Sequence, residues 1–188
     1  MSHNNKKQTN TILLETQNFI IRFPLENDLE DLLELYSDKL RSSTFNSDNC
    51  EDNFYYPTLE RIIEVYKFWK ESFIKGWFTR LCIIERKTRK VVGTLEVCKR
   101  VSADASNGCN ILRIDLLEQF EKEKNLFEIN EIILNNIEKF YGVKNTFTKI
   151  RSNQVERKKS FLKLGFREFD GKLIGRNNET YSDYWINF

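Results

Sequence analysis

Residues 111–150, ILRIDLLEQFEKEKNLFEINEIILNNIEKFYGVKNTFTKI, decide how this chain folds. The run 111–117 is short and mainly apolar, which is typical of a buried strand. From Leu126 onward, apolar residues recur every three or four positions until Gly142, a pattern that predicts an amphipathic helix. Residues 146–150 are again strand-like. A connection of this length joins parallel strands, so we expect the two strands to be parallel neighbours.

Further strands and a helix flank this unit. Residues 78–86 and 90–101 are two extended runs separated by three residues, which is a hairpin length. After the unit, residues 154–164 predict a short helix that ends at a glycine. Two more strands are expected over residues 166–169 and 180–188. The centre of the chain therefore predicts an antiparallel meander followed by a strand–helix–strand crossover.

The first third of the chain predicts one strand and two helices. Residues 13–23 alternate with a period of two, which indicates a single strand. Helical spacing follows over residues 29–40, and Asn27 with Glu30 resembles a capping box at its start. After a polar loop, residues 59–73 present one apolar helical face.

Length and composition fit one globular domain. The chain has 188 residues, 40% of them hydrophobic, and we expect a single domain over residues 11–188 preceded by a disordered tail at residues 1–10. No apolar run approaches the roughly 18 residues of a membrane span, so a cytoplasmic protein is expected. The net charge of +2 comes from 30 basic and 28 acidic residues, which gives no strong field for nucleic acid.

Histidine and cysteine usage narrows the possible chemistry. The only histidine, His3, lies in the polar tail, which argues against a Ser/His/Asp triad or a Cys/His pair. The four cysteines form no CxxC pair, so neither a zinc site nor a disulfide is expected. Any chemistry would use carboxylates, tyrosines, lysines, backbone amides or water.

Three segments carry a family resemblance: LETQNFIIRFP at residues 14–24, KVVGTL at residues 90–95 and FLKLGFRE at residues 161–168. In this order and spacing they resemble the GNAT superfamily of acyl-CoA N-acyltransferases, and more narrowly its ribosomal-protein and N-terminal acetyltransferase branch. The resemblance covers residues 13–188. It implies an α/β (α+β) fold with a mixed, mostly antiparallel sheet of about seven strands flanked by helices. Two parallel strands would be splayed in its middle.

The resemblance also implies a place for acetyl-CoA. The pantetheine arm would lie in the gap between strands 111–117 and 146–150, and backbone N–H groups at Asp115, Leu116 and Leu117 would bond the thioester carbonyl. The pyrophosphate would lie at the next helix start, and its residues here are Lys122, Glu123, Lys124, Asn125 and Leu126. Asn153, Gln154 and Lys158 match further cofactor-contacting positions.

This helix start departs from the family pattern. The family usually places glycines there, yet none occurs between residues 109 and 141, and three glutamates outnumber two lysines over residues 118–124. A side chain at these positions crowds an approaching phosphate, and the negative charge opposes it. An ordinary acidic helix start explains the segment equally well.

Glu96 and Asp115 are the candidate catalytic residues, because a carboxylate on a central strand could deprotonate an incoming ammonium group. Strand carboxylates that merely face solvent are the alternative. The position at which many family members carry a tyrosine acid holds Phe161, which suits core packing.

The leading hypothesis is an N-acetyltransferase that transfers an acetyl group from acetyl-CoA to a primary amine of a small molecule or a protein. The alternatives are a catalytically inactive GNAT-fold binding or regulatory protein, and an RNA-associated protein that uses the basic residues near Arg157. The sequence leaves open the acceptor, the acyl group and the oligomeric state, with a homodimer among the options.

Overall fold

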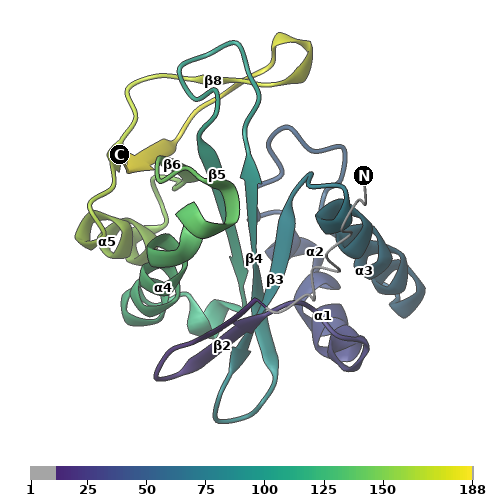
Figure 1. Ribbon diagram of the computed structural model, residues 1–188. Helices are drawn as coiled ribbons and strands as arrows, with labels where there is room; N and C mark the ends of the chain where they lie inside the picture. The colour runs from purple at the N-terminus through teal and green to yellow at the C-terminus, as the bar shows by residue number, and fades with distance from the viewer. Residues whose placement is uncertain (1–11, 188) are drawn as a thin grey trace, which may run out of the picture.

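A computed structural model describes residues 12–187 (Figure 1). Its helices are η1 (Glu26–Asp28), α1 (Leu29–Tyr36), α2 (Lys39–Ser42), α3 (Leu59–Ile74), η2 (Glu118–Phe120), α4 (Glu123–Tyr141), α5 (Val155–Lys163) and η3 (Arg176–Asn178). Its strands are β1 (Leu13–Glu15), β2 (Phe19–Arg22), β3 (Thr79–Glu85), β4 (Val91–Lys99), β5 (Asn110–Leu116), β6 (Thr146–Lys149), β7 (Arg167–Glu168), β8 (Leu173–Ile174), β9 (Thr180–Tyr181) and β10 (Tyr184–Asn187). The expected tail at residues 1–10 lies outside the described residues.

The strands form a mixed, mostly antiparallel sheet, as expected. Within the described residues the order is β1-β2-β3-β4-β5-β6-β10-β7, and β8 and β9 pair separately. Helices α1 and α3 cover one face of this sheet, and α4 and α5 cover the other (Figure 1). Each helix turns its apolar side toward the sheet, so the core consists of two layers divided by the strands.

The parallel pair at the centre of the sheet is β5 and β6. Their pairing joins Asn110 to Thr146 and ends with Leu112 opposite Thr148. Strand β5 continues to Leu116 along β4, while Lys149 pairs with β10 instead of β5. The two strands are therefore parallel neighbours that diverge at their carboxyl ends, which confirms the prediction.

Helix α4 bridges these strands and follows its predicted pattern. Leu126, Ile129, Ile133 and Ile137 are all buried, which is the apolar face that the spacing indicated. The helix ends where Gly142 takes a left-handed conformation with φ of 68°. It begins at Glu123, three residues before the first apolar position, so the acidic segment belongs partly to the helix itself.

The single strand predicted over residues 13–23 is wrong. It is a hairpin of β1 and β2, with a turn at residues 16–18. The backbone N–H of Thr16 donates to the carbonyl of Phe19 at 2.9 Å, and the Thr16 side chain also bonds Phe19. A side-chain-stabilised turn needs no glycine or proline, so the period-two pattern runs through it unbroken.

Two further boundaries differ from the predictions. The helix expected over residues 29–40 ends at Tyr36, because the Asp38 carboxylate accepts from the backbone of Leu40 and Arg41 and starts α2. The Asn27 cap is also wrong. Asp28 caps this segment instead: its carboxylate accepts from the backbone N–H of Leu25 at 2.7 Å. Near the carboxyl end, the strand expected over residues 180–188 is interrupted between β9 and β10.

Candidate functional site

Beyond Leu112, β5 no longer pairs with β6, so one edge of β5 faces the gap between the two strands. Leu117 donates its backbone N–H to the carbonyl of Val92 at 2.9 Å, so this amide is engaged on the β4 side. Successive amides of a strand point to alternate edges. The N–H of Leu116 is therefore directed away from β4, toward the space that β6 has left. Of the three backbone positions expected at the gap, Leu116 is the one whose amide faces it, and the amides of Asp115 and Leu117 face β4.

Gly93 on β4 lies against this part of β5. A Cβ at Gly93 would come within 2.4 Å of the Asp115 carbonyl oxygen and of a Leu116 side-chain carbon. Only glycine therefore permits this close approach of the strands. Gly93, the glycine of the KVVGTL segment, therefore lets β5 lie close against β4 at the level of the gap.

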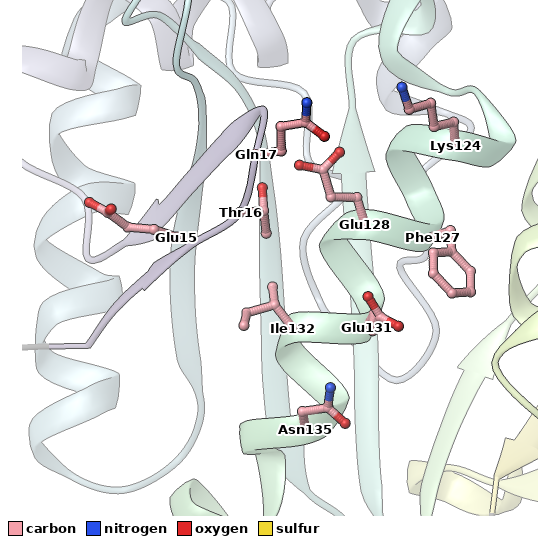
Figure 2. Close-up of a pocket in the computed structure, with 9 residues that line it drawn as sticks. All are labelled: Glu15, Thr16, Gln17, Lys124, Phe127, Glu128, Glu131, Ile132 and Asn135. Atoms are coloured by element: carbon pink, nitrogen blue, oxygen red, sulfur yellow. The ribbon is translucent and has the colours of Figure 1, made fainter.

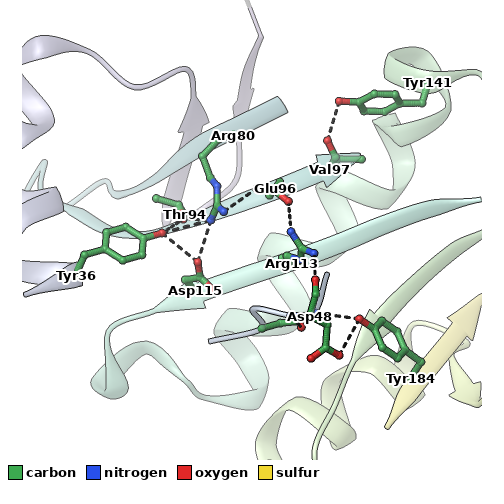
Figure 3. A network of polar contacts seen from close by, with 11 residues as sticks. Tyr36, Asp48, Arg80, Thr94, Glu96, Val97, Arg113, Asp115, Tyr141 and Tyr184 are labelled. Atoms are coloured by element: carbon green, nitrogen blue, oxygen red, sulfur yellow. Dashed lines mark hydrogen bonds and ion pairs between the residues drawn. The ribbon is translucent and has the colours of Figure 1, made fainter. Parts of the chain in front are cut away.

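The proposed bases Glu96 and Asp115 lie in a closed network of charges between the sheet and α1 (Figure 3). Arg80 donates to Glu96 at 2.8 Å and to Asp115 at 2.9 Å, and all three residues are at most 4% exposed. The hydroxyl of Tyr36 donates to Asp115 at 3.0 Å, and Arg113 donates to Glu96 at 2.6 Å. Every carboxylate in the network thus has a cationic partner.

Burial and pairing determine the pKa of each acid. Burial acts to raise the pKa of Glu96, but Arg80 and Arg113 outweigh it and hold the value below the usual range. Burial raises the pKa of Asp115, against the opposing effect of Arg80. Burial also raises the pKa of Tyr36 well above its usual range, so this phenol stays a donor. Neither carboxylate faces solvent, and the geometry suits the fixing of β5 better than proton exchange with an exposed amine.

The start of α4 holds an anion supplied by the chain itself. Lys122 is the residue before the helix, and the backbone N–H of Glu123 donates to a carboxylate oxygen of Glu156 at 3.0 Å. This hydrogen bond is the main reason that the pKa of Glu156 is below its usual range. The contact is the one that an external oxyanion makes at a helix N-terminus.

The glutamates beside this start are paired with cations of α5. Arg157 contacts Glu121 through two of its nitrogens, and Lys163 lies 2.5 Å from Glu123. Arg157 also reaches into the strand gap, where it donates to the carbonyl of Ile114 at 2.8 Å. The acidic character that the sequence indicated is therefore largely balanced within the fold.

The other expected cofactor positions are dispersed. Asn125 donates its side-chain amide to the Phe120 carbonyl at 3.2 Å, and Leu126 is fully buried in the core. Gln154 accepts the backbone N–H of Arg151 at 2.9 Å, and the adjacent Asn153 is exposed. The ammonium group of Lys158 lies over the Trp185 ring at 5.4 Å. The structure brings together the start of α4 and the first turn of α5, but not all of these side chains.

Two features of this arrangement were not predicted. One is the position of Glu156 at the start of α4, and the other is the contact of Arg157 with the strand gap. The two side chains pair with residues 33 and 36 positions earlier in the chain. Periodicity records only neighbours along one helix, so it carries no sign of these contacts. A single glutamate before the basic run Arg157, Lys158, Lys159 was the one available signal.

Two shallow hollows lie along α4. One, of about 390 Å³, lies between the β1–β2 turn and the middle of α4 (Figure 2). Lys124 lines it beside three glutamates. The other, of about 440 Å³, lies near Lys144 and Asn187. In the first hollow, Glu128 accepts from the backbone and side-chain amides of Asn18, which ties the hairpin to the helix.

The described residues show no metal centre and no helix suited to a bilayer. Between residues 12 and 187, no three histidine, cysteine, aspartate or glutamate side chains gather closely enough to hold a metal ion. All four cysteines are free thiols. None of the helices in this range is both long and apolar enough to cross a membrane.

No protein-family model and no curated protein sequence matches the chain. Solved structures match it by fold. An acetyltransferase of the GNAT family from Bacillus anthracis superimposes with a TM-score of 0.69 at 12% identity, covering 94% of this chain and 98% of that one. The ribosomal-protein-S5-alanine acetyltransferase from Vibrio fischeri gives 0.69 at 10% identity and covers 94% of both chains.

A third similar structure contains the acyl donor. The microcin C7 self-immunity acetyltransferase MccE, in complex with acetyl-CoA and AMP, gives a TM-score of 0.69 at 12% identity and covers 92% of this chain and 93% of that one. The chain therefore has the fold of the GNAT acetyltransferases, including ribosomal-protein acetyltransferases, at low sequence identity.

Proposed function

We propose that this protein is an acyl-CoA-dependent N-acyltransferase that transfers an acetyl group from acetyl-CoA to a primary amine. The observation that carries the proposal is the divergence of β5 from β6, with the N–H of Leu116 directed into the gap. An amide donor fixed on a strand edge is suited to bond a thioester carbonyl and the charge that develops on it.

The chain contributes binding and positioning groups to this reaction. Acetyl-CoA supplies the activated acyl group, and Leu116 would orient its carbonyl. The network of Arg80 and Asp115 would hold β5 in place, which makes Asp115 a positioning residue. The start of α4 fits a phosphate because the Glu123 amide already binds a carboxylate oxygen. Lys122 and Lys163 would add cationic charge beside it.

The similar solved structures support the class of acceptor. One of them is named for the acetylation of a ribosomal protein, so a protein amino group is a reasonable acceptor for this chain as well.

The basic residues that could favour RNA are largely engaged within the fold. Lys149 pairs with Asp48 at 2.6 Å and Lys159 with Glu156 at 3.5 Å.

A second candidate is a GNAT-fold binding protein without catalysis. The specific observation in its favour is that Glu156 and Arg157 fill positions that a cofactor would need, beside a turn without glycine. This candidate keeps the fold and the buried network but predicts no acetyl transfer.

Thermal unfolding with and without acetyl-CoA tests whether the cofactor binds. A ligand at 100 times its dissociation constant stabilises the native state by about 2.7 kcal/mol, or roughly 5 to 10 °C for a domain of this size. AMP at the same concentration is the control for a nonspecific nucleotide effect. A shift below a degree at millimolar acetyl-CoA would contradict the proposal.

Release of the CoA thiol in the presence of amines separates the two candidates. The acyltransferase predicts thiol release that depends on both acetyl-CoA and an amine, such as the amino terminus of a peptide. Thermal stabilisation without thiol release over a panel of peptides and polyamines would favour the non-catalytic candidate.

A further inference from the structure

We propose that Glu156 and Arg157 form an internal plug that occupies both halves of the acyl-CoA cleft and must be displaced before the cofactor binds. The inference rests on the proposed function, because it concerns access to the same cleft. Glu156 takes the anion position at the start of α4, and Arg157 takes the strand edge in the gap between β5 and β6.

The Glu156 carboxylate occupies the place at the start of α4 where the pyrophosphate of the cofactor would lie. Its carboxylate accepts the backbone N–H of Glu123 at 3.0 Å, as a phosphate oxygen would. Lys159, one turn further along α5, lies 3.5 Å from the same carboxylate group. Because one helix start offers few free amides, the carboxylate and a pyrophosphate compete for the same donors.

Arg157 occupies the place in the strand gap where the pantetheine arm of the cofactor would lie. Its side chain is buried, and it donates to the carbonyl of Ile114, beside the Leu116 amide in the strand gap. A pantetheine arm would need the same strip of backbone. The ion pair with Glu121 holds the guanidinium in this position, so the acidic residues of the α4 start also keep the plug in place.

Adjacent positions on α5 make the plug a single unit. The two side chains leave the first turn of the helix, so a small shift of that turn would withdraw both. This gives a physical reason for a cofactor turn without glycine: its residues Glu121 and Glu123 pair with Arg157 and Lys163 of α5. Cofactor affinity would then depend on how easily α5 releases its contacts with α4.

The test is calorimetric titration with coenzyme A of the wild type, Glu156→Gln and the matched control Glu138→Gln. Glu138 lies near the other end of α4 and also pairs with a lysine, Lys144, so the control removes the same charge from an exposed ion pair. Glu156→Gln should bind coenzyme A about tenfold more tightly than the wild type, and Glu138→Gln should not. The gain should shrink at high salt, because part of it is the removal of charge repulsion.

Three outcomes are distinguishable. Tighter binding by Glu156→Gln alone supports the plug. Equal binding by all three proteins would overturn the plug and leave the proposed function standing. Binding by none of them at millimolar coenzyme A would overturn both. Circular dichroism establishes that each variant is folded. A second variant, Glu156→Ala, establishes that a change in binding reflects the loss of the carboxylate.

Discussion

Individual side chains show how strongly this fold depends on charge pairing inside it. Arg80 is the cation that neutralises both Glu96 and Asp115, and its guanidinium also lies over the rings of Phe54 and Trp69. These groups are almost completely buried, so each charge depends on its partner for stabilisation. The network holds β3, β4, β5 and α1 together at the level of the strand gap (Figure 3).

Removal of the Arg80 side chain should therefore lower the unfolding free energy strongly. Arg80→Met leaves Asp115 buried without its paired cation and Glu96 with Arg113 alone. Breaking a buried pair in this way typically costs about 3 to 5 kcal/mol of unfolding free energy. Urea denaturation measures the loss. Arg86→Met is the control, because Arg86 pairs with Glu15 near solvent and should cost under about 1 kcal/mol.

If Arg80→Met does not fold well enough to be measured, Arg80→Lys keeps the charge and should give an intermediate loss. A loss below about 1 kcal/mol in Arg80→Met would mean that the network does not hold the strands.

Contacts between elements show where pH acts on the fold. Glu128 on α4 accepts two hydrogen bonds from Asn18 in the β1–β2 turn, at 2.6 and 2.7 Å. Partial burial acts to raise the pKa of Glu128, but hydrogen bonds from Thr16 and Asn18 outweigh it and lower the value. A carboxyl whose folded pKa is lowered stabilises the fold above its unfolded pKa and loses this effect as the pH falls through the folded value.

Glu128→Gln should thus lower the unfolding free energy by about 1 to 2 kcal/mol at pH 7. The difference from the wild type should shrink well below pH 4, where the wild-type carboxyl is protonated too. Urea denaturation at both pH values measures it, with Glu131→Gln, which lines the same hollow, as the control. An equal loss at pH 7 and in acid would show that the charge of Glu128 is not involved.

The elements differ in how well the sequence predicts them, for physical reasons. Helix α4 was predictable because its apolar residues follow a helical period and Gly142 marks its end, and β5 and β6 because each is a short strand-like run beside it. The β1–β2 turn was missed because Thr16 stabilises it by side-chain hydrogen bonds that leave the polarity pattern unchanged. Of the candidate site, the gap and the backbone positions Asp115, Leu116 and Leu117 were expected from the family resemblance, and the pairing of β5 with β4 then singles out the Leu116 amide. The plug depends on contacts between distant positions that no local pattern encodes.

The molecule as a whole combines the GNAT fold with contacts of Glu156 and Arg157 at the start of α4 and beside the strand gap. Strands β5 and β6 diverge beyond Leu112, and α5 lies beside α4 on one face of the sheet (Figure 1). The two helices are joined by the Glu156 and Arg157 contacts, so the proposed donor site and its closure belong to the same part of the structure.

The measurement that tests acetyl-CoA binding in this gap most directly is an amide NMR titration of protein labelled with ¹⁵N-leucine. Leucines occur inside the gap, beside it and far from it, so one label reports on all three places. We expect the amide of Leu116 to shift most on addition of acetyl-CoA, and that of Leu126 near the α4 start to follow. Leu134, which lines the distant hollow, should stay unchanged. An unmoved Leu116, or shifts centred on Leu134, would contradict the assignment of the strand gap as the donor site.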